Sequence, residues 1–342
     1  KENCMYEKDV VNVARENGWF KGKDKDFDFQ KAYNPYDFSG LRACEARVWS
    51  FFRTFDKSMD KYKKHIMGDA SEEPMPLYII PDRKVSLADV REGMRNHYEG
   101  TELSMTNDPG AGVYKVPYRW RPMTFKSEGR EYFNERAIAT QQTGFVLIAQ
   151  MRSWLPDAVG GILWFGVDDA NTAVLTPMYT SITEIPECYR RGNGSMTEFS
   201  WTSAFWIHNW VANMAYNRYE PMIRDIRPVQ KELEDSYVDL VKNTDAKALE
   251  LLKSSPAQAS AYLTEVCGKV ANEATARWKK LGEYLLVKYM DGNVKKEKDG
   301  KFEENGYGQI VSPNFPGYSQ EYYDQVAKSG EAKHLEVPKK DK

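Results

Sequence analysis

The chain has 342 residues and a nearly balanced charge, because 48 Lys and Arg residues face 50 Asp and Glu residues and leave a formal net charge of -2 at pH 7. Its aromatic content of 13% is too high for a disordered chain, and no apolar run approaches the roughly 18 residues that a membrane-spanning helix needs. The charge balance also argues against nucleic acid or an anionic membrane surface as a partner, since both attract a clustered positive field.

Two amphipathic helices are predicted in the first hundred residues. Apolar side chains recur every three or four positions over residues 41–56, which predicts a helix with one buried face. Ser86 and Asp89 have the spacing of a capping box, in which a hydroxyl and a carboxylate accept from backbone N–H groups at a helix start. We therefore expect a second helix over residues 86–99.

The predicted strands fall mainly within residues 114–180. Three β-rich runs, residues 143–152, 161–167 and 172–179, are separated by turn-forming residues. The last two runs are four residues apart, which predicts a hairpin and therefore antiparallel pairing. Residues 161–167 are apolar at nearly every position, so we expect a central strand with both faces covered.

Long helices are expected over residues 198–290, where Ser255 before Pro256 is typical of a helix N-cap followed by proline. The chain after residue 292 is charged and poor in aliphatic residues, so residues 293–342 are predicted to be a peripheral tail. The pattern as a whole predicts an α+β fold with an antiparallel sheet and flanking helices, and residues 1–292 are predicted to belong to a single domain.

Motif searches exclude several chemistries. The sequence contains no Gly-rich phosphate loop, dinucleotide fingerprint, His-Glu-x-x-His helix or Gly-x-Ser-x-Gly elbow. With only four His residues a His-rich metal site cannot be built, so no metal or cofactor is predicted. The four Cys residues are far apart in sequence, and idle thiols, one disulfide and a reactive thiol all stay open. They are Cys4, Cys44, Cys188 and Cys267.

Polar side chains in the strand region are the first candidates for substrate binding. Gln142, Gln150 and Arg152 lie in runs that otherwise bury apolar residues, and an unpaired polar group there is costly unless it is directed into a site. Ordinary alternation, with these groups facing solvent, explains them equally well. Trp164 and the turn that begins with Asp168 belong to the same block.

A second candidate cluster mixes cations with aromatic rings. Residues 114–126 interleave Arg119 and Arg121 with Tyr118 and Trp120. Such a mixture can bind single-stranded nucleic acid, but one short cluster in a nearly neutral chain is weak support for that. A site for one carboxylate is a better interpretation, because a guanidinium binds it in a bidentate manner. A plain surface without a ligand is commoner than either of these.

Five segments carry a family resemblance: residues 42–49, 141–145, 155–169, 203–213 and 276–282. They resemble the secreted cysteine dipeptidases of the secernin-related family, and the similarity spans nearly the whole chain. The resemblance is strongest to forms from gut-type anaerobic bacteria. It implies a secreted or periplasmic N-terminal-nucleophile hydrolase with an αββα sandwich, of which this chain is the C-terminal portion.

The nucleophile of that family is a cysteine exposed as the first mature residue, with the free α-amine as base and a hydrophobic strand after it. Cys4 is not terminal and precedes the polar run Met5-Tyr6-Glu7-Lys8, so we do not assign it as the nucleophile. The chain opens without an initiator Met or a signal peptide. We therefore expect the catalytic part before Lys1, no catalytic residue in this chain, and no activity of this chain alone.

The resemblance implies that the full-length protein hydrolyses dipeptides and that this chain supplies sheet scaffold and substrate pocket. A dipeptidase has to recognise an ammonium group and a carboxylate at short range. From charge type and position, we expect Asp168 or Asp169 to bind the ammonium group, and Arg152, Arg119 or Arg121 to bind the carboxylate.

Two other functions stay open. An amidase acting on another small amide, such as a conjugated bile acid or an acyl-amino acid, would be favoured by an apolar pocket without paired charges. A non-catalytic peptide- or carbohydrate-binding protein would use tryptophan rings as stacking platforms, and burial of these rings would exclude it. The rings in question are Trp120, Trp154, Trp164 and Trp201. A homo-oligomer is possible in each case.

Overall fold

The computed structural model describes residues 5–311, 314–330 and 332–337, so Cys4 lies outside the described residues. Internal contacts divide the chain into two units, residues 1–85 and 86–342, and each is described by itself. None of the helices in the described ranges combines the length and the apolar character needed to cross a bilayer.

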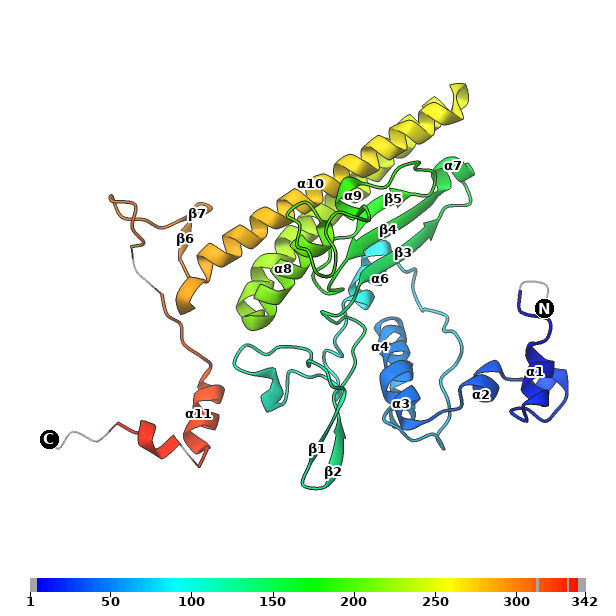
Figure 1. Ribbon diagram of the computed structural model, residues 1–342, viewed down its shortest axis with the longest axis horizontal. Helices are drawn as coiled ribbons and strands as arrows, with labels where there is room; N and C mark the ends of the chain where they lie inside the picture. Colours follow the sequence, from blue (N-terminus) through cyan, green and yellow to red (C-terminus); the bar gives the residue numbers. More distant parts are fainter. Residues whose placement is uncertain (1–4, 312–313, 331, 338–342) are drawn as a thin grey trace. The chain divides into compact units, whose positions relative to one another are not determined.

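The first unit is helical (Figure 1). The helix expected over residues 41–56 is present as a π-helical turn, Leu41–Glu45, that continues into α4 (Ala46–Phe55). Trp49 of α4 is fully buried, and its indole N–H donates to the backbone oxygen of Met59 at 2.8 Å. The other helices of this unit are α1 (Val10–Glu16), α2 (Phe29–Tyr33), α3 (Phe38–Gly40) and α5 (Lys63–Ile66).

The second unit contains an antiparallel sheet with the strand order β3-β4-β5. Its strands are β3 (Phe145–Met151), β4 (Gly161–Val167) and β5 (Thr176–Tyr179), and α7 (Asp157–Gly160) lies between β3 and β4. The predicted antiparallel pairing and the central position of residues 161–167 are confirmed. A separate hairpin pairs β1 (Thr124–Ser127) with β2 (Arg130–Phe133).

The two faces of the β3-β4-β5 sheet differ. Ile148, Ile162 and Trp164 are buried on one face. On the other face, Phe145 and Leu147 of β3 are 62% and 42% exposed, and the side chains of β4 are partly exposed. The expectation that both faces of residues 161–167 are covered therefore holds for one face and in part for the other, where Leu163, Phe165 and Val167 are partly buried.

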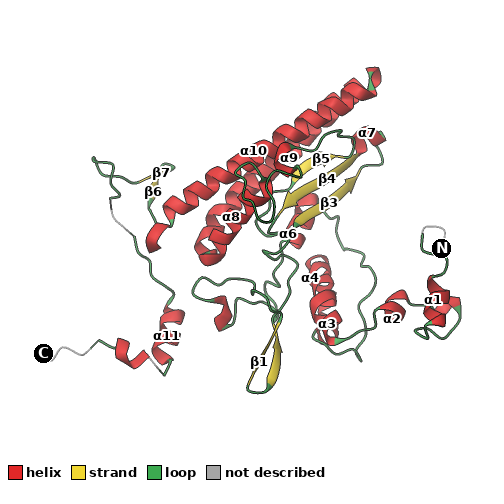
Figure 2. Cartoon of the chain, in the orientation of Figure 1, coloured by secondary structure: helices red, strands yellow, loops and turns green. Residues whose placement is uncertain are grey.

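Long helices pack beside the sheet (Figure 2). They are α8 (Ala204–Asn217), α9 (Tyr219–Ser254) and α10 (Pro256–Lys288), and the short α6 (Leu87–Met94) contacts β3. The predicted capping box of Ser86 and Asp89 is present at the start of α6. The Ser255 side chain accepts from the backbone of Gln258, which confirms the predicted cap of α10. The α+β class with long C-terminal helices is confirmed.

Two helix boundaries were predicted wrongly. The helix expected over residues 86–99 ends at Met94, because the Asn96 side chain accepts from the backbone of Tyr98, whose φ of 65° is left-handed. The helical region expected from residue 198 begins at Ala204, because Ser195 and Glu198 form a bridge in a loop.

Where the structure describes it, the chain after residue 292 is mostly exposed and forms a short hairpin, an α-helix and a 3₁₀ helix, Ala332–Leu335. The elements are β6 (Glu297–Lys298), β7 (Lys301–Phe302) and α11 (Gln320–Lys328). Phe302 stacks on Tyr284 of α10 with ring centroids 5.7 Å apart. The assignment of residues 1–292 to a single domain, with residues 293–342 as a tail, stays a prediction.

Candidate functional site

Asp168 is the most unusual residue of the turn between β4 and β5. Its backbone φ is 67°, a left-handed value that Asp and Asn tolerate better than most other residues and that is frequent at functional sites. Asn209 of α8 donates to Oδ1 at 2.9 Å, whereas Oδ2 is buried and has no hydrogen-bond partner among the described residues. Burial raises the pKa of Asp168 to about 7, and the hydrogen bond from Asn209 opposes this shift only in part.

Asp169 has a different role in the same turn. Its Oδ2 accepts from the backbone N–H of Thr172 at 3.0 Å and from the Thr172 hydroxyl at 2.8 Å. Its Oδ1 accepts from the hydroxyl of Tyr216 at 2.7 Å. Both carboxylate oxygens are thus occupied, and Asp169 holds the turn against α8. Only Asp168 keeps an acceptor atom for a further partner.

Tyr118 joins this turn to the cation-rich loop that the sequence indicated. Its ring lies 4.2 Å from the ring of Tyr216 in an edge-to-face contact, and Tyr216 donates to Asp169. Burial, followed by the negative charge of Asp169, raises the pKa of Tyr118 above its ordinary value. The predicted residues Arg119 and Arg121 follow Tyr118 in the chain, so the start of this loop lies close to the turn that holds Asp169.

A pocket lies beside this loop, and we call it the arginine pocket. Arg121 and Gln142, both exposed, are joined by a hydrogen bond from Arg121 Nε to Gln142 Oε1 at 3.0 Å. No carboxylate among the described residues lies within ion-pair distance of Arg121, so its terminal N–H groups remain available. The lining residues are Met105, Tyr118–Met123, Asn134–Arg136 and Thr140–Gln142.

Arg119 also lines the arginine pocket, but its guanidinium is already bound. It donates to the backbone oxygens of Met105, Val116 and Tyr118 at 2.6 to 3.2 Å, and to Asp108 at 2.5 Å. Its side chain is only 14% exposed. Arg119 therefore holds the loop in place and leaves Arg121 as the predicted carboxylate ligand with unused donors.

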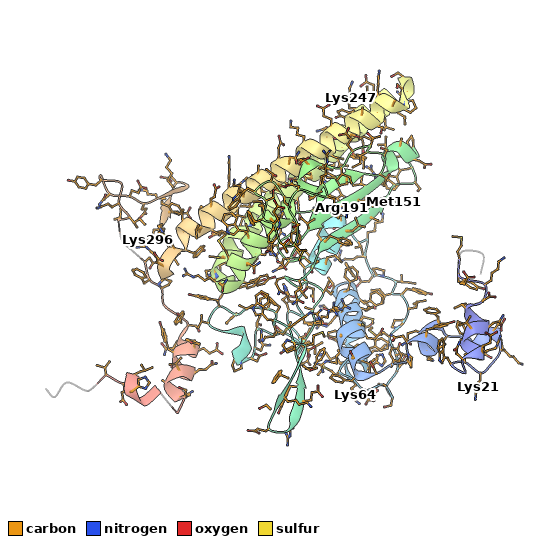
Figure 3. The ribbon with its side chains drawn as sticks, viewed as in Figure 1. Lys21, Lys64, Met151, Arg191, Lys247 and Lys296 are labelled. Atoms are coloured by element: carbon orange, nitrogen blue, oxygen red, sulfur yellow. The ribbon has the colours of Figure 1, made fainter. Side chains whose placement is uncertain are left out.

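Three predicted residues lie away from this region. The seven residues of β3 span about 20 Å, which places Arg152 at the end of the strand opposite Asp168. The same end carries Met151 (Figure 3). Arg152 forms a buried ion pair with Asp245 of α9. Gln150 accepts from the indole of Trp164 at 2.9 Å on the covered face of the sheet, where Trp164 is 1% exposed. Their roles as substrate ligands stay predictions without support from this geometry.

Neither of the two buried thiols in the described part of the chain, Cys188 and Cys267, is activated as a nucleophile. Burial raises the pKa of Cys267 to about 11 and also raises the pKa of Cys188, which disfavours the reactive thiolate. Cys44 is an exposed free thiol on the π-helical turn, where Arg47 contacts its sulfur at 3.9 Å. The described residues hold no cluster of three or more side chains suited to bind a metal ion.

Sequence reasoning missed the partners of the predicted residues. Asn209, Tyr216 and Asp245 lie 41 to 93 positions from the residues they bind. The sequence signal near Asn209 was the family resemblance of residues 203–213, which did not single out this residue. Of the four tryptophans proposed as stacking platforms, only Trp164 is buried, while Trp120, Trp154 and Trp201 are 61%, 76% and 51% exposed.

Comparison with known proteins identifies the family. The model of peptidase family C69 matches residues 1–232, which is more than half of the chain. The chain therefore belongs to peptidase family C69.

Three relatives illustrate the similarity. Probable dipeptidase B of Lactococcus lactis is 26% identical over 287 residues, which cover 82% of this chain and 52% of that protein. Probable dipeptidase of Salmonella dublin is 26% identical over 177 residues, 52% of this chain and 35% of its own length. Dipeptidase A of Lactobacillus helveticus is 22% identical over 193 residues, which cover 56% of this chain and 33% of that protein. The chain spans about half the length, or less, of these relatives.

Proposed function

We propose that this chain is part of a dipeptidase, with a catalytic cysteine encoded before Lys1 and a secreted or periplasmic location. The observation that carries the proposal is membership of peptidase family C69 together with relatives named dipeptidases. In this proposal the described residues supply the sheet scaffold of an αββα sandwich and part of the substrate pocket. The partly uncovered apolar face of the sheet supports the sandwich, because a second layer is needed to bury it.

The arginine pocket binds the α-carboxylate of the substrate in this proposal. A guanidinium presents parallel N–H groups that match the two oxygens of a carboxylate. Arg121 is exposed, and its Nε donates to Gln142 Oε1. This hydrogen bond fixes the plane of the guanidinium and leaves the terminal nitrogens for the ligand. The pocket is open to substrate because Arg121 and Gln142 are both exposed.

Asp168 binds the ammonium group of the substrate in this proposal. Its free Oδ2 and its raised pKa mean that the carboxyl group lacks a cationic partner in the described residues. An ammonium group at Oδ2 would lower the pKa and ionise the carboxyl group, since an opposite charge favours the charged form. Asp168 is 1% exposed, so the ligand reaches it only after neighbouring side chains move.

The chemistry assigned to the part before Lys1 is acyl transfer to a thiolate. The sulfur attacks the peptide carbonyl, the α-amine accepts the thiol proton and returns it to the departing amine, and the C–N bond breaks. Water then hydrolyses the thioester and releases the second amino acid. The described residues hold the two charged ends of the substrate, which fixes the carbonyl relative to the sulfur.

The test replaces Arg121 by Met in the full-length protein. We expect kcat/KM for a dipeptide such as Leu-Gly to fall about tenfold to a hundredfold, because the loss of a charged hydrogen bond costs about 1.5 to 3 kcal/mol. The matched Leu-Gly amide lacks the carboxylate, so its kcat/KM should not change. Initial rates of amine release measure both substrates.

Arg130→Met is the matched control, because Arg130 is an exposed arginine of β2 that does not line the arginine pocket. It should leave both rates unchanged. Equal losses for the dipeptide and its amide in the Arg121 variant would contradict carboxylate binding. Faster turnover of an acyl-amino acid than of any dipeptide by the wild type would replace the dipeptidase proposal by the amidase alternative.

A further inference from the structure

A groove between α6 and α9 contains buried charges that the proposed function does not use. Its floor is formed by Arg91 of α6, by Arg95 directly after this helix, and by Gln230 and Glu234 of α9. All four are 6% exposed or less. The exposed residues at its rim include Glu92, Lys231 and Asp235, and Ala88 and Arg227 complete the lining.

Most polar groups of the groove are already bound. Arg95 donates to Glu234 at 2.6 Å and to Glu92 at 2.8 Å. The same Oε1 atom of Glu234 accepts from the backbone N–H of Leu175 at 2.9 Å. Arg227 donates to the backbone oxygen of Asn171 at 2.7 Å and also to the side-chain oxygen of Asn171. Lys231 forms an ion pair with Asp235.

Arg91 is the exception. Its Nη1 donates weakly to the backbone oxygen of Glu234 at 3.4 Å, and its Nε lies 3.9 Å from the Glu234 carboxylate. Its Nε and Nη2 are buried without a hydrogen-bond partner among the described residues. The guanidinium lies over the ring of Trp164 at 4.6 Å from the centroid, which fixes its position.

The floor therefore carries two guanidinium groups against the single buried carboxylate of Glu234. A buried charge with unused N–H donors is expensive unless an anion pairs with it. Burial lowers the pKa of Arg91 from its ordinary value, and the attraction of Glu234 only partly offsets that, which agrees with incomplete pairing.

We propose that the groove between α6 and α9 binds a small monocarboxylate, whose oxygens accept from the unpaired N–H groups of Arg91. The planar guanidinium matches a carboxylate, and the negative side chains of Glu92, Glu234 and Asp235 disfavour a dianion such as phosphate. Because Nε and Nη2 are shielded from water, the ligand enters when the exposed side chains of the rim shift.

The experiment measures the thermal unfolding temperature of the full-length protein at pH 7 and constant ionic strength while acetate replaces chloride. We expect Tm to rise by about 3 °C once acetate exceeds its Kd by roughly tenfold, and to keep rising with the logarithm of the acetate concentration. Arg91→Met should abolish this rise. Arg224→Met, which removes an exposed arginine of α9 that does not line the groove, should keep it.

Two outcomes overturn the proposal: no rise in Tm with acetate in the wild type, or the same rise in the Arg91 variant. A larger rise with inorganic phosphate than with acetate overturns the choice of a monocarboxylate. A second variant, Glu92→Gln, keeps Arg91 and tests acetate binding in the groove even if the Arg91 variant does not fold. This variant should lower several-fold the acetate concentration at which Tm begins to rise, because it removes a repelling charge, and an unchanged onset counts against the site.

Discussion

At the scale of single residues, Asp168 makes the stability of the protein depend on pH. Its pKa is about 7 in the folded chain and about 3.9 in an unfolded chain. Between these values the folded protein keeps a proton that the unfolded chain has lost. The stabilisation from this proton is fully present below about pH 4 and is lost as the pH rises through 7.

Asp168→Asn should remove that loss. Asn tolerates a positive φ and can still accept from Asn209, so the variant resembles the protonated side chain. Relative to the wild type, we expect the free energy of unfolding of the variant to rise by up to about 4 kcal/mol between pH 4 and pH 8. Urea unfolding at several pH values measures this difference.

A control comes from Asp299, which also has a positive φ, 51°, but is exposed. Asp299→Asn should follow the pH dependence of the wild type. Parallel curves for the wild type and the Asp168 variant would show that the carboxyl group of Asp168 is ionised in the folded protein at neutral pH, and the proposal of an unpaired buried carboxyl group would then fail.

At the scale of elements, Arg152 ties the end of β3 to α9. Its guanidinium donates twice to Asp245 of α9, and it also donates to the backbone oxygens of Val159 and Gly160 in α7. Tyr179 of β5 donates to the same carboxylate at 2.7 Å. The arginine is 7% exposed and the aspartate 16%, so this is a largely buried ion pair.

Arg152→Met should therefore lower the free energy of unfolding by about 3 kcal/mol, because it leaves Asp245 without its cation in a buried position. The double variant Arg152→Met, Asp245→Asn should lose less than the sum of the two single variants, since no unpaired charge remains. Urea unfolding measures both. A stable Arg152 variant with a selectively raised KM for dipeptides would instead support the substrate role expected from the sequence.

The elements also show what could be predicted from the sequence. Local rules placed the strands β3 and β4, the capping box of Ser86 and the cap of Ser255, because each depends on residues a few positions apart. The site depended on long-range pairs instead. Arg152 and Asp245 are 93 positions apart. The local sequence at the end of a strand is the same whether its arginine binds a substrate or a helix. The sequence therefore could not show which of the predicted arginines is free to bind a carboxylate.

At the scale of the whole molecule, the chain spans about half the length of its curated relatives, and the sheet presents an apolar face to solvent in the described residues. Phe145, Leu147 and Met151 of β3 are 62%, 42% and 61% exposed there, and Phe165 of β4 stacks beside Phe145. A contiguous apolar face of this kind is normally buried by another layer. In the proposed sandwich, that layer is the second sheet of the full-length protein.

Leu147→Asp tests this arrangement in the full-length protein. If a second sheet covers Leu147, the variant should lose at least about 3 kcal/mol of unfolding free energy, because an unpaired carboxylate would be buried in the core. Tyr132→Asp is the matched control, since Tyr132 of β2 is also 42% exposed, and its loss should stay below about 1 kcal/mol. Urea unfolding of both variants gives the comparison. Equal, small losses would mean that the face stays in solvent, and the proposed αββα sandwich would be wrong.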